Sequence, residues 1–248
     1  MWSRWWGMAA HLAPIDSSQC KYRWTSCEEE EMTGSEFLSE LPIEDRLALG
    51  RTLADLQREF ADRYDEETIE HFVVDSFTRL AGAAKTHKFL GVISERFARE
   101  RLMAMLETDP SGRSKPGVLF LCVHNAGRSQ MAAGWLRQLA GDRIRIYTGG
   151  SEPAAGLNPV AVDAMAEVGI DISAEFPKPW TEEVVRAVDV IVAMGCGDVC
   201  PVYPGTRREE WDLDDPEGKD LAVVERIRDE IRGRVEVLAA ELLGAAQT

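Results

Sequence analysis

The chain has 248 residues, of which 45% are hydrophobic, and its formal net charge at pH 7 is −15. This length allows one large domain or two small ones, and the hydrophobic fraction is sufficient for a packed core. The acidic balance argues against nucleic acid or an anionic membrane surface as a partner, because both are bound by basic patches. No apolar run approaches the roughly 20 residues that a membrane-spanning helix needs.

The first 33 residues differ in composition from the rest of the chain. They contain three tryptophans among the first six residues, no periodicity and an acidic run. They also lack the apolar stretch of about 7–15 residues and the cleavage site of a secretory signal peptide. We interpret residues 1–33 as a disordered leader. Because ordered composition begins after Met32, we expect this methionine to be the native start.

The chain carries five cysteines: Cys20, Cys27, Cys122, Cys196 and Cys200. An odd number in a chain that is neither small nor visibly secreted argues against a structural disulfide framework. Cysteines close to one another in a cytoplasmic protein indicate redox or nucleophilic chemistry instead. We therefore expect a cytoplasmic protein with reactive thiols.

Residues 34–108 have the apolar spacing of amphipathic helices, which predicts a small three-helix bundle. Asp65 is the expected N-cap of the second helix. The three apolar stripes are Leu49, Leu53, Leu56 and Phe60; Ile69, Val73, Phe77 and Leu80; and Leu90, Ile93 and Phe97. The bundle contains no catalytic motif, and its role is not evident from the sequence.

Residues 109–117 are rich in Pro, Gly, Ser and charge and are interpreted as a linker. Beyond it, in residues 118–248, strands and helices alternate. The pattern predicts strands at 118–123, 144–148 and 188–194 with a candidate fourth at 209–213, and helices at 129–140, 159–168, 181–187 and from Val224 to Leu242. This alternation predicts an α/β fold, a doubly wound four-stranded parallel sheet with helices on both faces. Ligands of such sheets bind beyond the carboxyl ends of the strands, and Cys122 lies at the end of the first strand.

The loop that follows Cys122 has the properties of an oxyanion cradle. A turn that leads into a helix presents backbone N–H groups, and the helix dipole adds partial positive charge. The forked guanidinium of Arg128 suits a tetrahedral oxyanion. The predicted oxyanion-binding residues are Val123, His124, Asn125, Ala126, Gly127 and Arg128.

The same loop is suited to activating a nucleophile. A helix N-terminus and a nearby cation stabilise a thiolate, and the Ser129 hydroxyl can donate a hydrogen bond to it. Gly127 and Asn125 tolerate backbone shapes that most residues resist. The alternative is that Cys122 is a small buried hydrophobic side chain at a strand end. The strand–loop–helix context favours the functional interpretation.

At this point the sequence resembles a known family. "CVHNAGRS" resembles the anion-binding signature of low-molecular-weight protein tyrosine phosphatases and of the arsenate reductases built on that fold. "TGGSEPAAGLNPVAV", "GIDIS" and "WDLDDPEGK" resemble further segments of these proteins. The resemblance covers about residues 118–234, and "HNAGRSQM" with "DDPEGK" is closer to the reductase branch.

The resemblance implies a thiol relay in which arsenate is reduced to arsenite. Cys122 would form a covalent adduct with arsenic, Cys196 would attack it, and Cys200 would close a disulfide that thioredoxin reopens. In a related branch mycothiol, working with mycoredoxin, takes the arseno-group. The two later cysteines are closer together here than in the usual thioredoxin-coupled pattern. No bound cofactor is implied, and phosphate and sulfate are the expected analogues of the substrate.

Cys196 and Cys200 also allow other interpretations. A pair with this spacing could bind a metal, but zinc needs about four ligands, and no further His or Cys lies nearby in sequence. Both could instead be inert packing cysteines. The glycines on either side of Cys196 favour a mobile redox segment. Ala133 stands where some relatives have a glutamate that helps to bind a monovalent cation, so we expect no metal site.

Asp215 precedes a proline, as the general acid of the family does, and is the expected proton donor to the leaving oxygen. A phosphotyrosine phosphatase would use Cys122, Arg128 and Asp215 without the later cysteines, but such enzymes usually carry aromatic residues near the aspartate, where Glu217, Gly218 and Lys219 follow here. A third hypothesis is a sensor without enzymatic activity. The sequence therefore favours arsenate reduction, with the phosphatase as the alternative.

Overall fold

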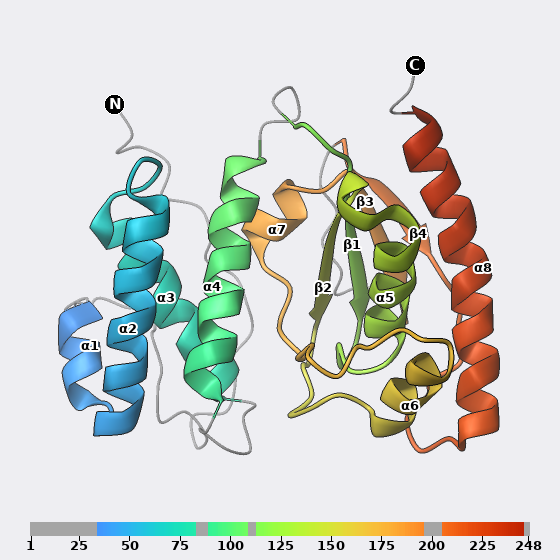
Figure 1. Ribbon diagram of the computed structural model, residues 1–248, viewed down its shortest axis with the longest axis horizontal. Coiled ribbons are helices and arrows are strands. Elements are labelled where there is room, and N and C mark those ends of the chain that lie inside the picture. The colour runs from blue at the N-terminus through green and yellow to red at the C-terminus, as the bar shows by residue number, and fades with distance from the viewer. Residues whose placement is uncertain (1–33, 83–88, 109–112, 196–204, 246–248) are drawn as a thin grey trace. The chain divides into compact units, whose positions relative to one another are not determined.

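The computed structural model describes residues 34–82, 89–108, 113–195 and 205–245 (Figure 1). The predicted leader, residues 109–112 of the predicted linker, and both Cys196 and Cys200 lie outside these ranges. Within them, no helix combines the length and hydropathy that crossing a bilayer requires.

The part of the chain before residue 108 is helical, as predicted. It consists of α1 (Gly34–Glu40), α2 (Ile43–Phe60), α3 (Glu66–Ala81) and α4 (Leu90–Leu106). The last three correspond to the predicted bundle, and α1 is an additional short helix. The Asp65 carboxylate accepts a hydrogen bond of 2.8 Å from the Thr68 N–H and so caps α3. The predicted apolar stripes meet in a single core, in which Leu49, Leu56, Phe77 and Phe97 are buried.

The second part is an α/β fold, which confirms the predicted class. Its strands are β1 (Gly117–Cys122), β2 (Arg145–Gly150), β3 (Val190–Met194) and β4 (Arg207–Glu210). Its helices are α5 (Arg128–Ala140), the 3-10 turn η2 (Gly141–Arg143), α6 (Pro159–Glu167), α7 (Glu182–Arg186) and α8 (Leu221–Ala245). All strand pairs are parallel, in the order β2-β1-β3-β4. In this register the Cα of Cys122 lies opposite Gly150 and Met194.

The fourth strand was predicted too late in the sequence. β4 occupies Arg207–Glu210 rather than 209–213. It is an edge strand, and its side chains are charged: Arg207 pairs with Glu209, and Arg208 with Glu210. Because an edge strand need not bury both faces, it lacks the apolar run by which the other strands were recognised. The apolar residues Trp211 and Leu213 follow the strand and were mistaken for it.

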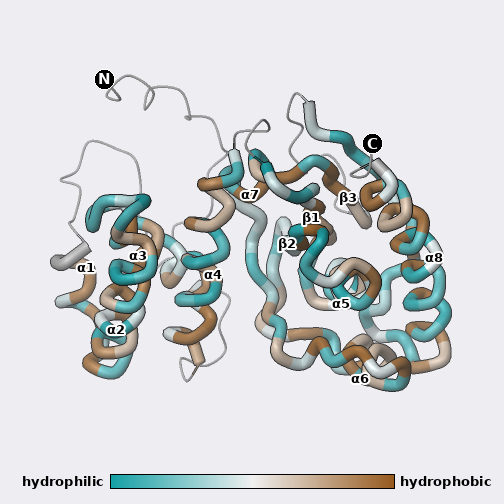
Figure 2. The backbone as a smooth tube through the Cα atoms, turned by 45° about the horizontal axis from the view of Figure 1, so that its top comes forward, coloured by the Kyte–Doolittle hydropathy of each residue, from teal (hydrophilic) through white to brown (hydrophobic). Residues whose placement is uncertain are grey.

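Alternate residues of the central strands pack on opposite faces of the sheet. One face, with Val118, Phe120 and Val192, packs against α5, α6 and α8. The other face, with Leu119, Leu121, Tyr147 and Ile191, packs against α7. Figure 2 shows the helices alternating between hydrophilic and hydrophobic residues along their length, as helices with one buried face do.

Helix α4 belongs to both parts of the chain. Ala104 of α4 lies in the same buried cluster as Leu119 and Tyr147 of the sheet. Arg101 of α4, itself only 4% exposed, pairs with Glu183 of α7. Residues 31–248 accordingly form one compact unit. The predicted boundary between a bundle and a second domain stays a prediction, since α4 covers part of the sheet.

Candidate active site

Cys122 is the last residue of β1, at the carboxyl end of the central sheet. All six residues of this strand are buried, and the exposed fraction of Cys122 is 2%. Cys122 is also a free thiol. The strand therefore carries a thiol to the edge of the sheet where ligands of parallel sheets bind.

The loop after Cys122 is held by its carbonyl groups. The carbonyl oxygens of Val123, His124 and Ala126 accept hydrogen bonds of 2.9, 2.9 and 3.0 Å from N–H groups in the segment 152–158. Asn125 is fully buried and has a φ of +49°, a left-handed conformation that asparagine tolerates. Gly127 occupies the N-cap of α5 and has no side chain with which to cap it. This arrangement fits the predicted cradle.

The position of the hydroxyl proton of Ser129 follows from its two neighbours. The Asn125 amide Nδ2 donates a hydrogen bond of 2.9 Å to the Ser129 Oγ. The orientation of that amide is in turn fixed by its Oδ1, which accepts the N–H of Lys178 at 3.0 Å. Ser129 Oγ lies 3.1 Å from Cys122 Sγ. Because Asn125 donates to Ser129, the hydroxyl of Ser129 keeps its own proton and can donate it to the sulfur.

Arg128 begins α5 and pairs with Asp215. Its Nη2 lies 2.7 Å from Asp215 Oδ2, although the two residues are far apart in sequence. The side chain of Arg128 is 8% exposed and that of Asp215 is 46% exposed. Gly195, with a φ of +79°, lies against the guanidinium, since a Cβ there would be 2.9 Å from Nη1 of Arg128. The two predicted charged residues of the site are thus brought into direct contact.

The residues around the thiol and Arg128 enclose a small cavity. It measures about 10 Å³ and is lined by Cys122, His124, Ala126, Gly127, Arg128, Asn158, Asp215, Pro216 and Glu217. This volume corresponds to about one water molecule. A tetrahedral anion that takes the Nη2 of Arg128 therefore replaces the Asp215 carboxylate there.

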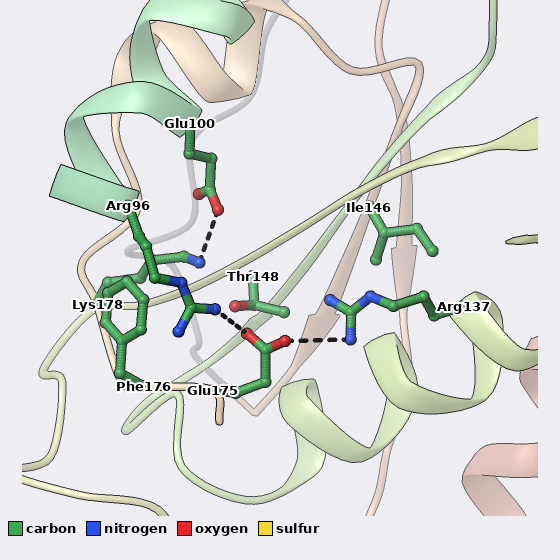
Figure 3. A pocket seen from close by; sticks show the side chains of 8 residues that line it. All are labelled: Arg96, Glu100, Arg137, Ile146, Thr148, Glu175, Phe176 and Lys178. Atoms are coloured by element: carbon green, nitrogen blue, oxygen red, sulfur yellow. Dashed lines mark hydrogen bonds and ion pairs between the residues drawn. The ribbon is translucent and has the colours of Figure 1, made fainter. Parts of the chain in front are cut away.

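A larger cavity of about 140 Å³ lies beside the loop and does not contain the cysteine (Figure 3). Its three cations face carboxylates within the cavity: Lys178 pairs with Glu100 at 2.8 Å, and Glu175 lies 3.3 Å from Arg137 and 3.8 Å from Arg96. We assign the candidate active site to the smaller cavity, because it alone of the two holds the thiol and the loop.

Most of the predicted site residues come together. Cys122, His124, Ala126, Gly127, Arg128 and Asp215 line one cavity, and Ser129 is in hydrogen-bond contact with Cys122 and with Asn125, whereas Cys196 and Cys200 lie outside the described residues. Two further residues of the site were not predicted from the sequence: Asn158, whose backbone N–H donates to the Ala126 carbonyl, and Gln130, whose Nε2 donates to the Asn125 carbonyl at 3.0 Å. The sequence "NP" at 158–159 signals a helix start, but nothing in it indicates a contact with the loop.

Two protein families match the chain. Residues 117–247 match the family described as low molecular weight phosphotyrosine protein phosphatase. Residues 49–106 match a family described as protein-tyrosine-phosphatase-like, N-terminal domain. The helical part therefore has relatives of its own.

Similar proteins of known name include arsenate reductases. One from Staphylococcus epidermidis is 40% identical over 49% of this chain and 95% of its own length. One from Bacillus subtilis is 42% identical over 49% of this chain and 94% of its own. The solved structure of a thioredoxin-dependent arsenate reductase from Corynebacterium glutamicum has a TM-score of 0.72 at 39% identity and covers 79% of this chain and 97% of that one. Residues 117–248 make up about half of this chain. A likeness that covers 79% of the chain therefore extends into the preceding helices.

Proposed function

The chain belongs to the low molecular weight phosphotyrosine protein phosphatase family, and we propose that within this family it reduces arsenate to arsenite with thiols as the source of electrons. The observation that carries the proposal is the likeness, over 79% of this chain, to a thioredoxin-dependent arsenate reductase. The site geometry supports it, since a buried thiol, a guanidinium and a carboxyl lie around one cavity.

Arsenate binding uses the loop and Arg128. The loop is anchored through the carbonyl oxygens of Val123, His124 and Ala126, so its N–H groups are available to an anion. The guanidinium of Arg128 binds two oxygens of a tetrahedral anion once Asp215 rotates away. Since nearly half of the Asp215 side chain is exposed, this rotation meets little obstruction.

The first chemical step is the attack of the Cys122 thiolate on arsenic. A sulfur–arsenic bond forms, and one oxygen of arsenate leaves as water after taking a proton that the Asp215 carboxylate, once released from Arg128, has acquired from solvent. The hydroxyl of Ser129, 3.1 Å from the sulfur, holds the thiolate before attack. The product of this step is a covalent adduct in which arsenic is still pentavalent.

The second step transfers the electrons. The thiolate of Cys196 attacks the sulfur of Cys122, so that a disulfide forms and the sulfur–arsenic bond breaks. The electron pair of the broken bond stays on arsenic, which leaves as trivalent arsenite. Cys200 then attacks Cys196 and frees the Cys122 thiolate, and an external dithiol reduces the Cys196–Cys200 disulfide. Gly195, the described residue that precedes Cys196 in sequence, lies against Arg128.

We propose thioredoxin as the external reductant, because the Corynebacterium glutamicum relative is named as thioredoxin-dependent. None of the relatives named above is described as using mycothiol, so mycothiol and mycoredoxin enter only as a second arm of the test. A relay of free thiols needs a compartment that keeps thiols reduced, and we therefore propose a cytoplasmic location.

The test is arsenite formation from arsenate by the purified protein with thioredoxin, thioredoxin reductase and NADPH. The wild type should turn over, and Cys196→Ser and Cys200→Ser should not. The matched control is Cys20→Ser with Cys27→Ser, which removes two thiols that the relay does not use and should leave turnover unchanged. Turnover only with mycothiol and mycoredoxin would retain the reductase and remove the proposed disulfide relay.

The alternative function, phosphotyrosine hydrolysis, makes a different prediction with the same proteins. It needs Cys122, Arg128 and Asp215 but neither later cysteine. Hydrolysis of an aryl phosphate that is equal in wild type and Cys196→Ser, with no arsenite under either reductant, would replace arsenate reduction as the function of this site.

A further inference from the structure

Asn158 joins three separate segments of the chain around the candidate active site. Its backbone N–H donates 3.0 Å to the Ala126 carbonyl of the cysteine loop. Its side-chain Oδ1 accepts the N–H of Ala161 at 3.0 Å and caps α6. Its side-chain Nδ2 donates to the Pro216 carbonyl at 3.4 Å and to Glu217 Oε2 at 3.2 Å. The exposed fraction of Asn158 is 7%, so these bonds form largely out of solvent.

The segment that Asn158 holds is the one that carries Asp215. Pro216 is buried, and it rests on the cysteine loop, since a Cβ on Gly127 would lie 2.7 Å from the Cγ of Pro216. The N–H of Glu217 donates 3.0 Å to Asp215 Oδ1. The backbone on the C-terminal side of Asp215 is therefore fixed to both α6 and the cysteine loop.

We propose that Asn158 is a positioning residue, which holds the Asp215–Glu217 segment against the cysteine loop and so sets where Asp215 delivers its proton. This proposal rests on the proposed function for the role of Asp215. With Pro216 fixed, only the Asp215 side chain has to rotate for the substrate to enter and then to return over the leaving oxygen. A proton donor that keeps its backbone in place is the kind of preorganisation on which general acid catalysis depends.

A helix cap alone would not account for these contacts. Capping uses only the Oδ1 of Asn158, and aspartate or serine would cap α6 about equally well. The Nδ2 donor is the part of the side chain that the cap does not need, and both of its bonds go to the segment after Asp215. This difference separates the two roles experimentally.

The test uses Asn158→Asp and Asn158→Ser in the full-length protein, because both keep the cap and remove the amide donor. We expect kcat for arsenite formation to fall about tenfold, because the proton donor is displaced, while KM changes less than about threefold. Alkylation of Cys122 by iodoacetamide, followed on its peptide by mass spectrometry, should keep its wild-type rate and pH dependence, since the amide touches neither Cys122 nor Ser129.

A reciprocal exchange gives the conservative control. In Asn158→Asp the new carboxylate faces the carboxylate of Glu217, and adding Glu217→Gln supplies an amide donor from the opposite side. The double variant should recover a large part of the kcat that Asn158→Asp loses. A loss in Asn158→Asp that the second substitution leaves untouched would contradict the proposal.

Two further results would overturn it. One is a kcat within twofold of wild type in both single variants. The other is an equal fall in kcat and in the alkylation rate of Cys122, which would mean a general disturbance of the loop. If the wild type forms no arsenite, the proposed function fails. The anchoring role of Asn158 is then tested separately, by hydrogen exchange at the N–H groups of Glu217 and Lys219. Exchange about tenfold faster in the variants supports the anchor, and unchanged exchange refutes it.

Discussion

Arg128 is held on two sides by residues that come from different loops. Asp215 pairs with its Nη2, and Gly195 leaves room for its Nη1. These two contacts restrict the position of the guanidinium. A restricted position favours the binding of a tetrahedral anion. The glycine is as much a part of this arrangement as the carboxylate.

Gly195→Ala should weaken oxyanion binding. The new methyl group would lie 2.9 Å from Nη1 and displace the guanidinium. The matched control is Gly205→Ala, because Gly205 has a similar φ of +87° but nothing within 4 Å of the added Cβ. Both variants carry a strain of about 1–2 kcal/mol. We expect phosphate affinity, measured by calorimetry, to fall about tenfold only in Gly195→Ala. Equal affinities would contradict the packing role of Gly195.

The residues of the site were predictable where they share one local motif. Cys122, Arg128 and Ser129 lie within eight positions on a strand, a loop and a helix, so local patterns place them together. Asp215 was predicted through a family resemblance, and its pairing with Arg128 was not. Asn158 was missed because its role depends on a contact between a helix start and a distant loop, which no spacing in the sequence encodes.

At the scale of elements, burial decided what could be predicted. β1 and β3 are buried on both faces, and their sequences are runs of apolar residues. β4 lies at the edge of the sheet, and its sequence is charged. The short α1 has too few residues to show a helical period. The predicted ends of the remaining helices agree with the structure to within a few residues, as expected where the apolar stripe and the cap coincide.

The ion cluster around Arg101 links three helices. Nη1 of Arg101 lies 2.7 Å from Asp75 of α3, and Nε pairs with Glu183 of α7. The guanidinium also lies 4.7 Å from the ring centre of Phe72. Arg101→Met should therefore lower the free energy of unfolding by about 3 kcal/mol, because it removes the cation that pairs with Glu183 and one of the two cations, Arg101 and Arg79, that pair with Asp75. Urea denaturation measures this change.

Arg99→Met is the matched control for Arg101. Arg99 pairs with Glu59 and Glu95, but its side chain is 34% exposed, so the loss should stay below about 1 kcal/mol. Similar losses in the two variants would argue against a special role of the cluster.

The effect of Arg101→Met should depend on pH. Burial raises the pKa of Asp75, but Arg101 and Arg79 outweigh it and hold that pKa below its ordinary 3.8. A lowered pKa contributes stability above the unfolded value, and this contribution is lost as the pH falls below it. The difference between wild type and Arg101→Met should therefore be full at pH 7 and shrink below about pH 4. A difference that grows in acid would contradict this assignment.

For the whole molecule, the important question is whether the sheet folds without the preceding helices. α4 contributes Ala104 to the cluster that contains Leu119 and Tyr147, so removing it uncovers part of one face of the sheet. The curated relatives match only about half of this chain, and over that half they nevertheless cover nearly their whole length. The sheet part thus resembles proteins that match it over nearly their whole length. In this chain, one face of the sheet packs against α4.

We expect residues 117–248 to fold as an isolated fragment that is less stable than the full chain. The free energy of unfolding should fall by at least about 3 kcal/mol, which is the order of the free energy lost when one or two apolar side chains are exposed. The fragment should also bind more of an apolar dye than the full chain does. Burial raises the pKa of Tyr147 to about 12, and in the fragment that pKa should move towards its ordinary 10. A chain lacking only residues 1–33 keeps every described contact and serves as the control. Equal stability of the fragment would make α4 dispensable for the sheet.

The pairing of Asp215 with Arg128 has a consequence for selectivity among anions. On the proposed function, arsenate would exchange with a carboxylate that belongs to the protein rather than bind to an uncompensated cation. The measured binding free energy is therefore the difference between the interactions of two anions with the same guanidinium. The affinity should consequently vary only weakly with ionic strength. Phosphate has the same shape and charge and meets the same competitor, so this exchange lowers the affinities for both anions alike and does not by itself separate phosphate from arsenate.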